Sequence, residues 1–213
     1  MKNTRAVIVL VCLSAFIGFI PSIWADPIID QSFIDPNSSS AAFFQSFELG
    51  QTFTAGVTGE LIGVNLNFST TGAGTLDVSI RSVDAAGAPT STILGSTTIT
   101  TSGNTYFLLS EFIGFPSAIA SVAGQQYAIV ITAETIYNGA WFGYHEDSYA
   151  GGKQWANFGG SGWYHYEDPY DDPPRSWDLN FRTHVIPTPE PGILILLGIS
   201  MASVVGLKRW WKE

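Results

Sequence analysis

Apolar and polar residues alternate along several short stretches of this chain. The clearest stretch is 62–68, where every second residue is large and apolar and the residues between them are glycine or asparagine. Successive side chains of a strand point to opposite faces of its sheet, so this pattern predicts a strand with one buried face. Similar runs predict further strands at 76–80, 93–99, 106–109, 127–131 and 179–185.

Turn-forming residues, such as those at 84–89, separate these predicted strands, and no internal segment has the period of an amphipathic helix. Many short strands joined by turns are typical of a β-sandwich or a barrel. The sequence therefore predicts an all-β protein whose single antiparallel β-sandwich spans residues 47–186, with about eight or nine strands. Residues 26–46 are rich in serine and asparagine, and we expect a leader that joins a sheet edge only in part.

The amino-terminal end has the organisation of a secretory signal peptide. Lys2 and Arg5 precede an apolar run at 6–20, which Pro21 closes, and a small-residue cleavage position follows at Ala25. The apolar run is too short to span a bilayer comfortably. We therefore expect residues 1–25 to be removed by a signal peptidase and the protein to be exported.

The carboxyl-terminal end has an apolar run, 192–207, that ends in a basic cluster. As a helix, this run is about 24 Å long, shorter than the ~30 Å hydrocarbon core of a bilayer, so it predicts a short transmembrane helix. Lys208, Arg209 and Lys212 supply the positive flank that stays on the cytoplasmic side. The body of the protein is then expected outside the inner membrane.

Pro189, Glu190 and Pro191 directly precede this helix. Because proline cannot enter a helix interior, the three residues are expected to be extended and accessible. The order of this motif, a short apolar helix and a basic end resembles the PEP-CTERM sorting signal of exported proteins in Gram-negative bacteria that make extracellular polysaccharide. The resemblance implies that an exosortase, a membrane-embedded cysteine protease or transpeptidase, removes residues 187–213. The alternative is an ordinary carboxyl-terminal membrane helix.

The charge and the cysteine content of the chain exclude some classes of function. Residues 1–25 and 192–213 hold five of the nine basic residues and one of the eighteen acidic ones, which leaves the rest of the chain with a net charge of −13. Such a surface repels phosphates, so we exclude a nucleic-acid partner, and it favours solubility or cation binding. Cys12 is the only cysteine and lies in the signal peptide. The mature chain therefore lacks disulfides and thiol chemistry.

Six short motifs of the body carry a second resemblance. They lie at 50–53, 76–81, 124–127, 141–144, 149–152 and 178–183. In this order they resemble a jelly-roll-like, carbohydrate-binding-module-like β-sandwich of bacterial extracellular proteins, over residues 47–185. The resemblance implies architecture and no enzymatic activity. The acidic segment 167–174 departs from the plainer loop of that family.

Aromatic residues are concentrated between 141 and 177, in a segment rich in glycine, asparagine and aspartate. Flat apolar rings beside hydrogen-bonding groups match the faces and hydroxyls of sugar rings. Large aromatics also fill sandwich cores, and we expect most of them there, Trp141 included. The candidate glycan-binding rings, expected to be exposed on loops, are Trp155, Trp163, Tyr164 and Tyr170.

Four carboxylates lie close together in one segment stiffened by prolines. They belong to Glu167, Asp168, Asp171 and Asp172. Their mutual repulsion is relieved by a hard cation with oxygen ligands, so they are a candidate calcium site. A solvated acidic loop is the alternative interpretation.

The sequence contains no convincing catalytic constellation. His145, His165 and His184 lack metal-ligand spacing on a regular element, and the acidic pairs 146–147 and 167–168 are a weak match to the two carboxylates of a glycosidase. We therefore expect adhesion or glycan association at the cell surface or in the matrix, without catalysis. A structural matrix protein without a specific ligand and a glycan-active enzyme are the alternatives.

Overall fold

The structure is a computed structural model that describes residues 25–35, 39–43, 45–107, 111–136, 138–144, 149–165 and 177–188. Every regular element in these ranges is a β-strand, which confirms the predicted all-β class. The described ranges accordingly contain no helix of the length and apolarity needed to cross a membrane. The signal peptide before Ala25, the sorting motif and the predicted helix 192–207 lie outside them.

The described residues form fifteen strands, more than the eight or nine that the sequence predicted. Some predicted strands continue past a bend into a second short strand, as β4 does into β5, and strands of two to five residues are too short to show alternation. The strands are β1 (Ile28–Phe33), β2 (Ser39–Phe43), β3 (Phe47–Thr54), β4 (Gly59–Leu66), β5 (Phe68–Thr71), β6 (Ala73–Val83), β7 (Pro89–Ser102), β8 (Thr105–Phe107), β9 (Ile113–Ser121), β10 (Gln126–Ala133), β11 (Asn138–Tyr144), β12 (Gln154–Phe158), β13 (Trp163–Tyr164), β14 (Asp178–Leu179) and β15 (Phe181–Pro187).

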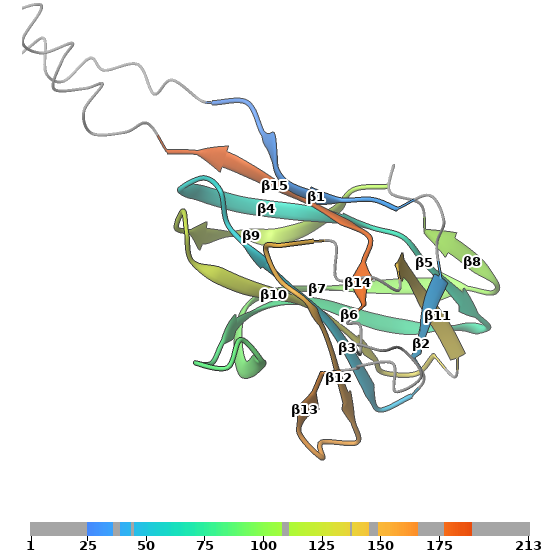
Figure 1. Ribbon diagram of the computed structural model, residues 1–213. Coiled ribbons are helices and arrows are strands. Elements are labelled where there is room, and N and C mark those ends of the chain that lie inside the picture. The colour runs from blue at the N-terminus through green and yellow to red at the C-terminus, as the bar shows by residue number, and fades with distance from the viewer. Residues whose placement is uncertain are drawn as a thin grey trace, which may run out of the picture.

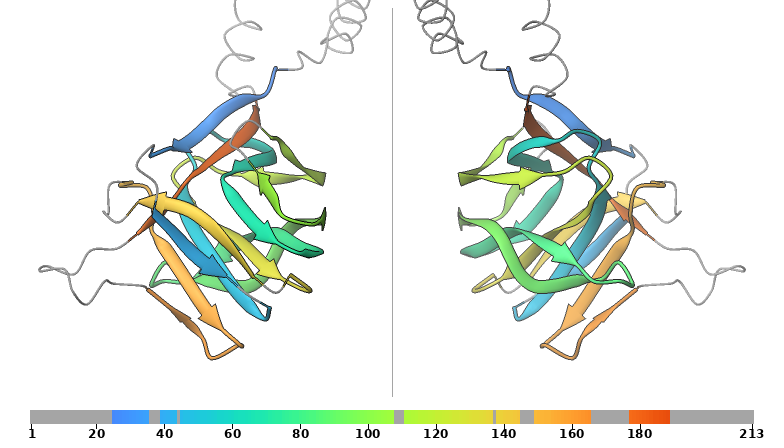
Figure 2. Two further views of the ribbon diagram at one scale, coloured as in Figure 1. Left: turned by 90° about the vertical axis from the view of Figure 1, so that its right-hand side faces the viewer. Right: turned by 90° about the vertical axis from the view of Figure 1, so that its left-hand side faces the viewer.

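The strands form three antiparallel sheets. A four-stranded sheet has the order β1-β15-β4-β9, a six-stranded sheet the order β13-β12-β3-β10-β6-β7, and a five-stranded sheet the order β14-β11-β5-β8 with β2 also on β11. The four-stranded sheet lies above the six-stranded one in Figure 1, and Figure 2 shows the two layers from their ends. This arrangement is compatible with a β-sandwich.

A corner joins the four-stranded and five-stranded sheets. Leu66 of β4 and Phe181 of β15 are paired there, and beyond them the chains diverge into β5 and β14, which both pair with β11. The Phe142 N–H donates to the Asn67 carbonyl and the Asn180 N–H donates to the Phe142 carbonyl, each at 2.8 Å. Because the N–H and C=O of one strand residue point to the same edge, β5 and β14 follow one another along one edge of β11. Strand β2 pairs along the other edge.

The inward faces of all three sheets contribute to one apolar core. Alternation explains its composition: Phe47 and Leu49 of β3 are buried in it, while Glu48, between these two residues, points to the other face of the sheet. The largest fully buried side chains include Trp141, Phe43, Phe53, Phe68 and Phe181. Trp141 therefore lies in the core, as expected from the sequence.

Two strands precede Phe47, where the predicted sandwich domain begins. Strand β1 pairs with β15 through Ile28↔Val185, and β2 pairs with β11 through Ala41↔Trp141. Residues 28–33 and 39–43, within the segment expected to be a leader, are thus strands of two sheets. Local alternation did not indicate this because each strand pairs with a partner that lies far away in the sequence.

Candidate functional site

Strands β12 and β13 form a short hairpin that projects beyond the sandwich, at the bottom of Figure 1. We call residues 154–164 the aromatic hairpin. Its turn includes Gly159, Gly160 and Gly162, all with positive φ, a conformation that glycine adopts without a steric penalty. The Gly162 N–H donates to the Asn157 Oδ1 at 3.1 Å, which ties the turn to β12. The hairpin is therefore held in one shape by its own residues.

The two faces of the aromatic hairpin have different surroundings. Ala156 opposes Leu49 of β3 and packs in the core with it, so the face that carries Ala156 and its paired residue Tyr164 is the inner one. Trp155 lies between inner positions and opposes Gly50, while Trp163 opposes Asn157. Strand alternation therefore puts Trp155 and Trp163 on the outer face of the six-stranded sheet.

The Trp163 ring lies against β3 at Gly50, which has no side chain. A Cβ atom built on Gly50 lies 3.4 Å from the Trp163 ring, 3.3 Å from Pro89 and 3.5 Å from Val130. The guanidinium carbon of Arg81 lies 5.9 Å from the centre of the same ring, within cation–π range. The indole is half-buried in this slot, so its position is fixed by packing.

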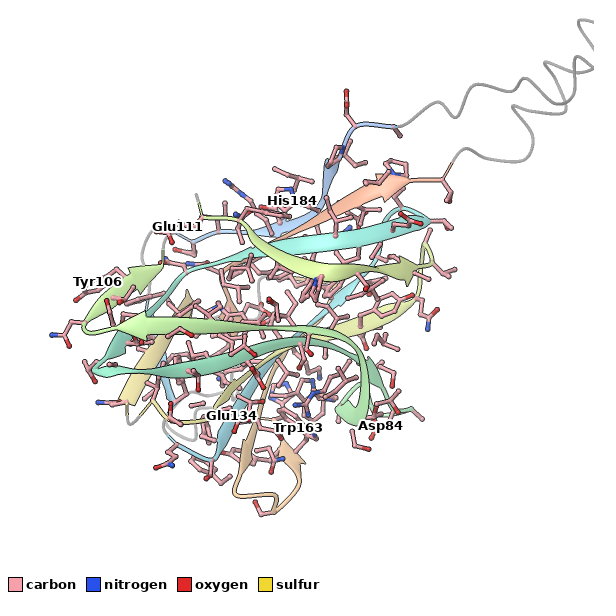
Figure 3. All side chains as sticks on the ribbon, turned by 180° about the vertical axis from the view of Figure 1, so that it is seen from behind. Asp84, Tyr106, Glu111, Glu134, Trp163 and His184 are labelled. Carbon is pink, nitrogen blue, oxygen red and sulfur yellow. The ribbon has the colours of Figure 1, made fainter. Side chains whose placement is uncertain are left out.

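A charged network borders the Trp163 ring. The Arg81 Nη2 donates to the Glu48 Oε1 at 2.7 Å, and the Asn157 Nδ2 donates to the Glu48 Oε2 at 2.7 Å. The Arg81 Nε also donates to the Ser79 hydroxyl at 3.2 Å. Figure 3 labels Trp163 in its place at the foot of the sheet. Each group of this network therefore orients another, and the ring has polar neighbours on its outer side.

The inner face of the hairpin carries a parallel pair of rings. The Phe158 and Tyr164 rings are stacked, with centroids 5.5 Å apart and planes inclined by 8°. Phe158 also packs on Phe47 with a centroid separation of 4.2 Å, yet 43% of it is exposed. The sequence prediction missed Phe158, although an aromatic residue directly before Gly159 and Gly160 at a turn is a signal for an exposed ring.

Three of the four predicted glycan-binding rings share this hairpin, but they differ from the expectation of exposed loop positions. Trp155 is buried, with 8% exposed, and its ring lies 5.6 Å from that of His165. Its indole N–H has no hydrogen-bond acceptor in the described part of the chain. Trp163 and Tyr164 are half-buried, and Tyr170 lies outside the described residues. Trp155 is thus a buried ring and not the exposed one that the sequence predicted, and the His165 ring lies beside it.

The predicted calcium ligands Glu167, Asp168, Asp171 and Asp172 all lie outside the described residues. Within the described ranges, no group of three or more His, Cys, Asp or Glu side chains is arranged to hold a metal ion.

His184 lies on the outer face of the four-stranded sheet. Its Nε2 hydrogen-bonds to the Asn65 side-chain oxygen, and its ring meets Phe112 edge-on at 5.2 Å. Burial, followed by the positive charge of Arg182, lowers the pKa of His184. These contacts hold the His184 ring in place against the sheet. His145 lies outside the described residues.

A buried polar cluster around Asp178 joins the six-stranded sheet to β14. The Asp178 carboxylate accepts hydrogen bonds from the Gln51 Nε2 at 3.1 Å and the Tyr149 N–H at 2.8 Å, and the Gln51 Oε1 accepts the Leu179 N–H at 2.7 Å. The Tyr149 hydroxyl donates to the Gln31 Oε1 at 3.0 Å. Asp178 and Gln51 are fully buried, so this cluster serves to tie strands together.

Comparisons with known proteins identify no relative of this chain. No protein-family model, no curated protein and no solved structure matches it.

Proposed function

We propose that this chain is an exported, exosortase-processed protein of the cell surface or the extracellular polysaccharide matrix, which associates with glycan through the aromatic hairpin. Its sandwich acts as a jelly-roll-like, carbohydrate-binding-module-like domain without catalytic activity. A signal peptidase releases the amino terminus, and residues 187–213 hold the chain in the inner membrane until the exosortase acts.

The observation that carries the glycan part of this proposal is the parallel pair of Phe158 and Tyr164. The two stacked rings lie beside the turn of a projecting hairpin, and Phe158, 43% of which is exposed, presents a flat apolar surface there. The C–H faces of sugar rings stack on such surfaces. Since Phe47 supports Phe158 from behind, the surface is organised before a ligand arrives, which lowers the entropic cost of binding.

The outer face of the hairpin offers polar groups that suit the same class of ligand. The Trp163 ring lies beside the Arg81 guanidinium, whose partner Glu48 is also held by Asn157. Sugar hydroxyls exchange hydrogen bonds with amides, carboxylates and guanidinium groups at the edge of an aromatic floor. A polysaccharide that contacts both faces of the hairpin therefore meets rings on each face and charged groups on one.

Removal of one stacked ring tests this function. We expect Phe158→Ala to weaken retention on polysaccharide from the native host by roughly fivefold, which corresponds to about 1 kcal/mol of lost stacking. Phe158→Tyr preserves the flat ring and is expected to retain binding. Tyr106→Ala is the matched control, because Tyr106 is a 69% exposed aromatic residue on β8 of another sheet.

The melting temperature of each variant separates binding from folding. Weaker retention of Phe158→Ala with an intact cooperative transition supports the hairpin site. Equal retention of the Phe158 and Tyr106 variants contradicts it. If the native protein itself is not retained, the second candidate function stands, a structural matrix component without a specific ligand.

The predicted processing has its own test, since it depends on residues 189–191 and not on the hairpin. Replacing Glu190 by alanine is expected to leave the full-length chain in the inner membrane. Fractionation followed by mass spectrometry measures the carboxyl terminus that remains. Release of the variant and the native protein in equal amounts and with the same terminus refutes exosortase processing.

A further inference from the structure

Strand β7 is the free edge of the six-stranded sheet. It pairs with β6 on one side, and no described strand pairs with its other side. Residues 95–102 follow residues 73–80 of β6 without a break in register, which gives a straight edge about 27 Å long. Figure 3 shows β7 running across the side of the molecule nearest the viewer, between the labelled Asp84 turn and Tyr106.

Edge strands expose unpaired backbone groups, and soluble proteins usually block them with charges, prolines, bulges or short length. The other described edges follow this rule. Strand β1 contains Asp30 and an irregular register, β9 contains Pro116, and β2, β8 and β13 have only five, three and two residues. Strand β7 has fourteen residues, its only proline is its first residue, Pro89, and its register shifts lie before Gly95, so residues 95–102 are not blocked.

The β7 edge also lacks charge in a strongly acidic protein. Neither β7 nor its neighbour β9 in the other layer contains a charged residue, although the chain has a net charge of −9. The two strands meet where Ile119 of β9 packs on Gly95 of β7. Beyond Gly95, the side chains of Ser96, Thr98 and Thr100 are exposed on the outer face of β7. This side of the sandwich is therefore a small-residue, neutral surface with open hydrogen-bonding positions.

We propose that β7 is a self-association edge, at which it pairs antiparallel with β7 of a second copy of this chain. A two-fold axis brings the same strip of each copy together, so only a strip without charge avoids opposing like charges. Threonine and serine side chains opposite one another form favourable cross-strand pairs. The pairing converts two six-stranded sheets into one continuous sheet, and it does not depend on the proposed glycan site.

The charge nearest to this edge is compatible with the pairing. Asp77 lies on β6 opposite Thr98, and its carboxylate accepts a hydrogen bond of 2.6 Å from the Thr98 hydroxyl. In the paired state the two copies of Asp77 are three strand spacings apart, about 14 Å. That separation exceeds the screening length of about 8 Å at physiological ionic strength. The acidic surface therefore opposes other modes of association more strongly than this one.

Single cysteines on β7 test the pairing in the exported full chain. We replace Cys12, the only native cysteine, by serine and introduce Thr98→Cys, Thr100→Cys or both. Residues opposite one another in antiparallel strands have Cα atoms about 4.5–5.5 Å apart, a separation that suits a disulfide. Both positions are included because the pairs Thr98–Thr98, Thr98–Thr100 and Thr100–Thr100 test two-fold axes at residues 98, 99 and 100.

We expect at least one of these variants to give tenfold more disulfide-linked dimer on a non-reducing gel than Ser161→Cys and Ala123→Cys. These controls carry exposed thiols at turns away from β7. Mass spectrometry identifies the partner, and unchanged melting temperatures show that each variant is folded. Dimer yields no greater than those of the controls overturn the proposal, as does a crosslink to a different protein.

Discussion

The indole N–H of Trp141 donates a hydrogen bond of 3.0 Å to the backbone carbonyl of Asn180. Both residues lie at the corner where β5 and β14 meet along β11, and both are almost completely buried. A carbonyl group at such a corner lies between two strands and has lost its regular partner in the sheet. The side chain of Trp141 therefore supplies a hydrogen bond that the change of strand direction removes.

Replacing Trp141 by phenylalanine is expected to reduce the free energy of unfolding by at least about 1–3 kcal/mol. The Asn180 carbonyl loses its buried donor, and the smaller ring leaves a cavity in the core. Denaturant unfolding measures the change. Tyr106→Phe at an exposed position serves as the control and is expected to stay within about 0.5 kcal/mol of the native protein. An equally small change in Trp141→Phe contradicts a stabilising role for this hydrogen bond.

Alternation predicted the strands whose two faces have different surroundings. In the stretch 62–68, Val64, Leu66 and Phe68 face the core, as alternation predicted. At the start of the stretch the register shifts between Leu61 and Gly63, so Leu61 takes the core position expected for Ile62. For residues 26–46 the sequence predicted only partial pairing at a sheet edge and did not locate β1 and β2, because their partners, β15 and β11, are distant in sequence and short segments without alternation give no local signal.

The aromatic hairpin shows a second limit of sequence patterns. The sequence indicated that aromatic residues gather in this segment, but β12 is covered on both faces, so alternation did not distinguish buried rings from exposed ones. The slot for Trp163 exists because Gly50 lacks a side chain on a different strand. That relationship follows from the pairing of β3 with β12 and from no local feature of either segment.

Removing Glu48 is expected to destabilise the protein and to loosen Trp163. The Arg81 and Glu48 side chains are only 10% and 20% exposed, so Glu48→Leu leaves a largely buried guanidinium without its carboxylate. We expect a loss of about 1.5–3 kcal/mol, the range for a hydrogen bond to a charged group. The double variant with Arg81→Met is expected to be more stable than Glu48→Leu alone, since no unpaired charge remains. Additive losses in this double-mutant cycle refute the coupling.

The ionisation of Tyr149 makes the stability of the fold depend on pH in the alkaline range. Burial, with smaller contributions from Asp30 and Asp178, raises the pKa of Tyr149 from 10.0 to about 12. The folded state therefore favours the neutral phenol, and this stability is complete below pH 10 and is lost as the pH rises towards 12. Tyr149→Phe is expected to flatten this part of the stability curve. Phenolate absorbance provides the direct titration, and a normal titration of all tyrosines contradicts the assignment.

The protonation of His184 makes the stability of the fold decrease as the pH falls below neutral. Because burial lowers the pKa of His184 below its usual 6.5, the folded state favours the neutral imidazole. The associated stability is complete above pH 6.5 and is lost as the pH falls through the lowered value. His184→Gln preserves a neutral hydrogen-bonding side chain beside Asn65 and is expected to reduce the loss of stability in acid. An unchanged acid profile in this variant shows that other groups determine it.

The contact between Gly95 of β7 and Ile119 of β9 joins the two layers of the sandwich beside the proposed self-association edge, and its contribution to stability can be tested. A Cβ atom at position 95 lies 2.5 Å from the Cδ1 and 2.7 Å from the Cγ1 of Ile119, so any side chain there forces Ile119 to move. Ile119 is 5% exposed and packs in the core, and overpacking of this kind costs about 1–3 kcal/mol. Gly95→Ala regains part of that cost, about 0.4–1 kcal/mol, through a less flexible unfolded chain. We therefore expect a net loss of stability in Gly95→Ala and a partial recovery on adding Ile119→Val, which removes the Cδ1 atom and leaves the Cγ1 as a smaller methyl group. A stabilised Gly95→Ala single variant shows that Ile119 moves freely and that the two layers are not held together at this point.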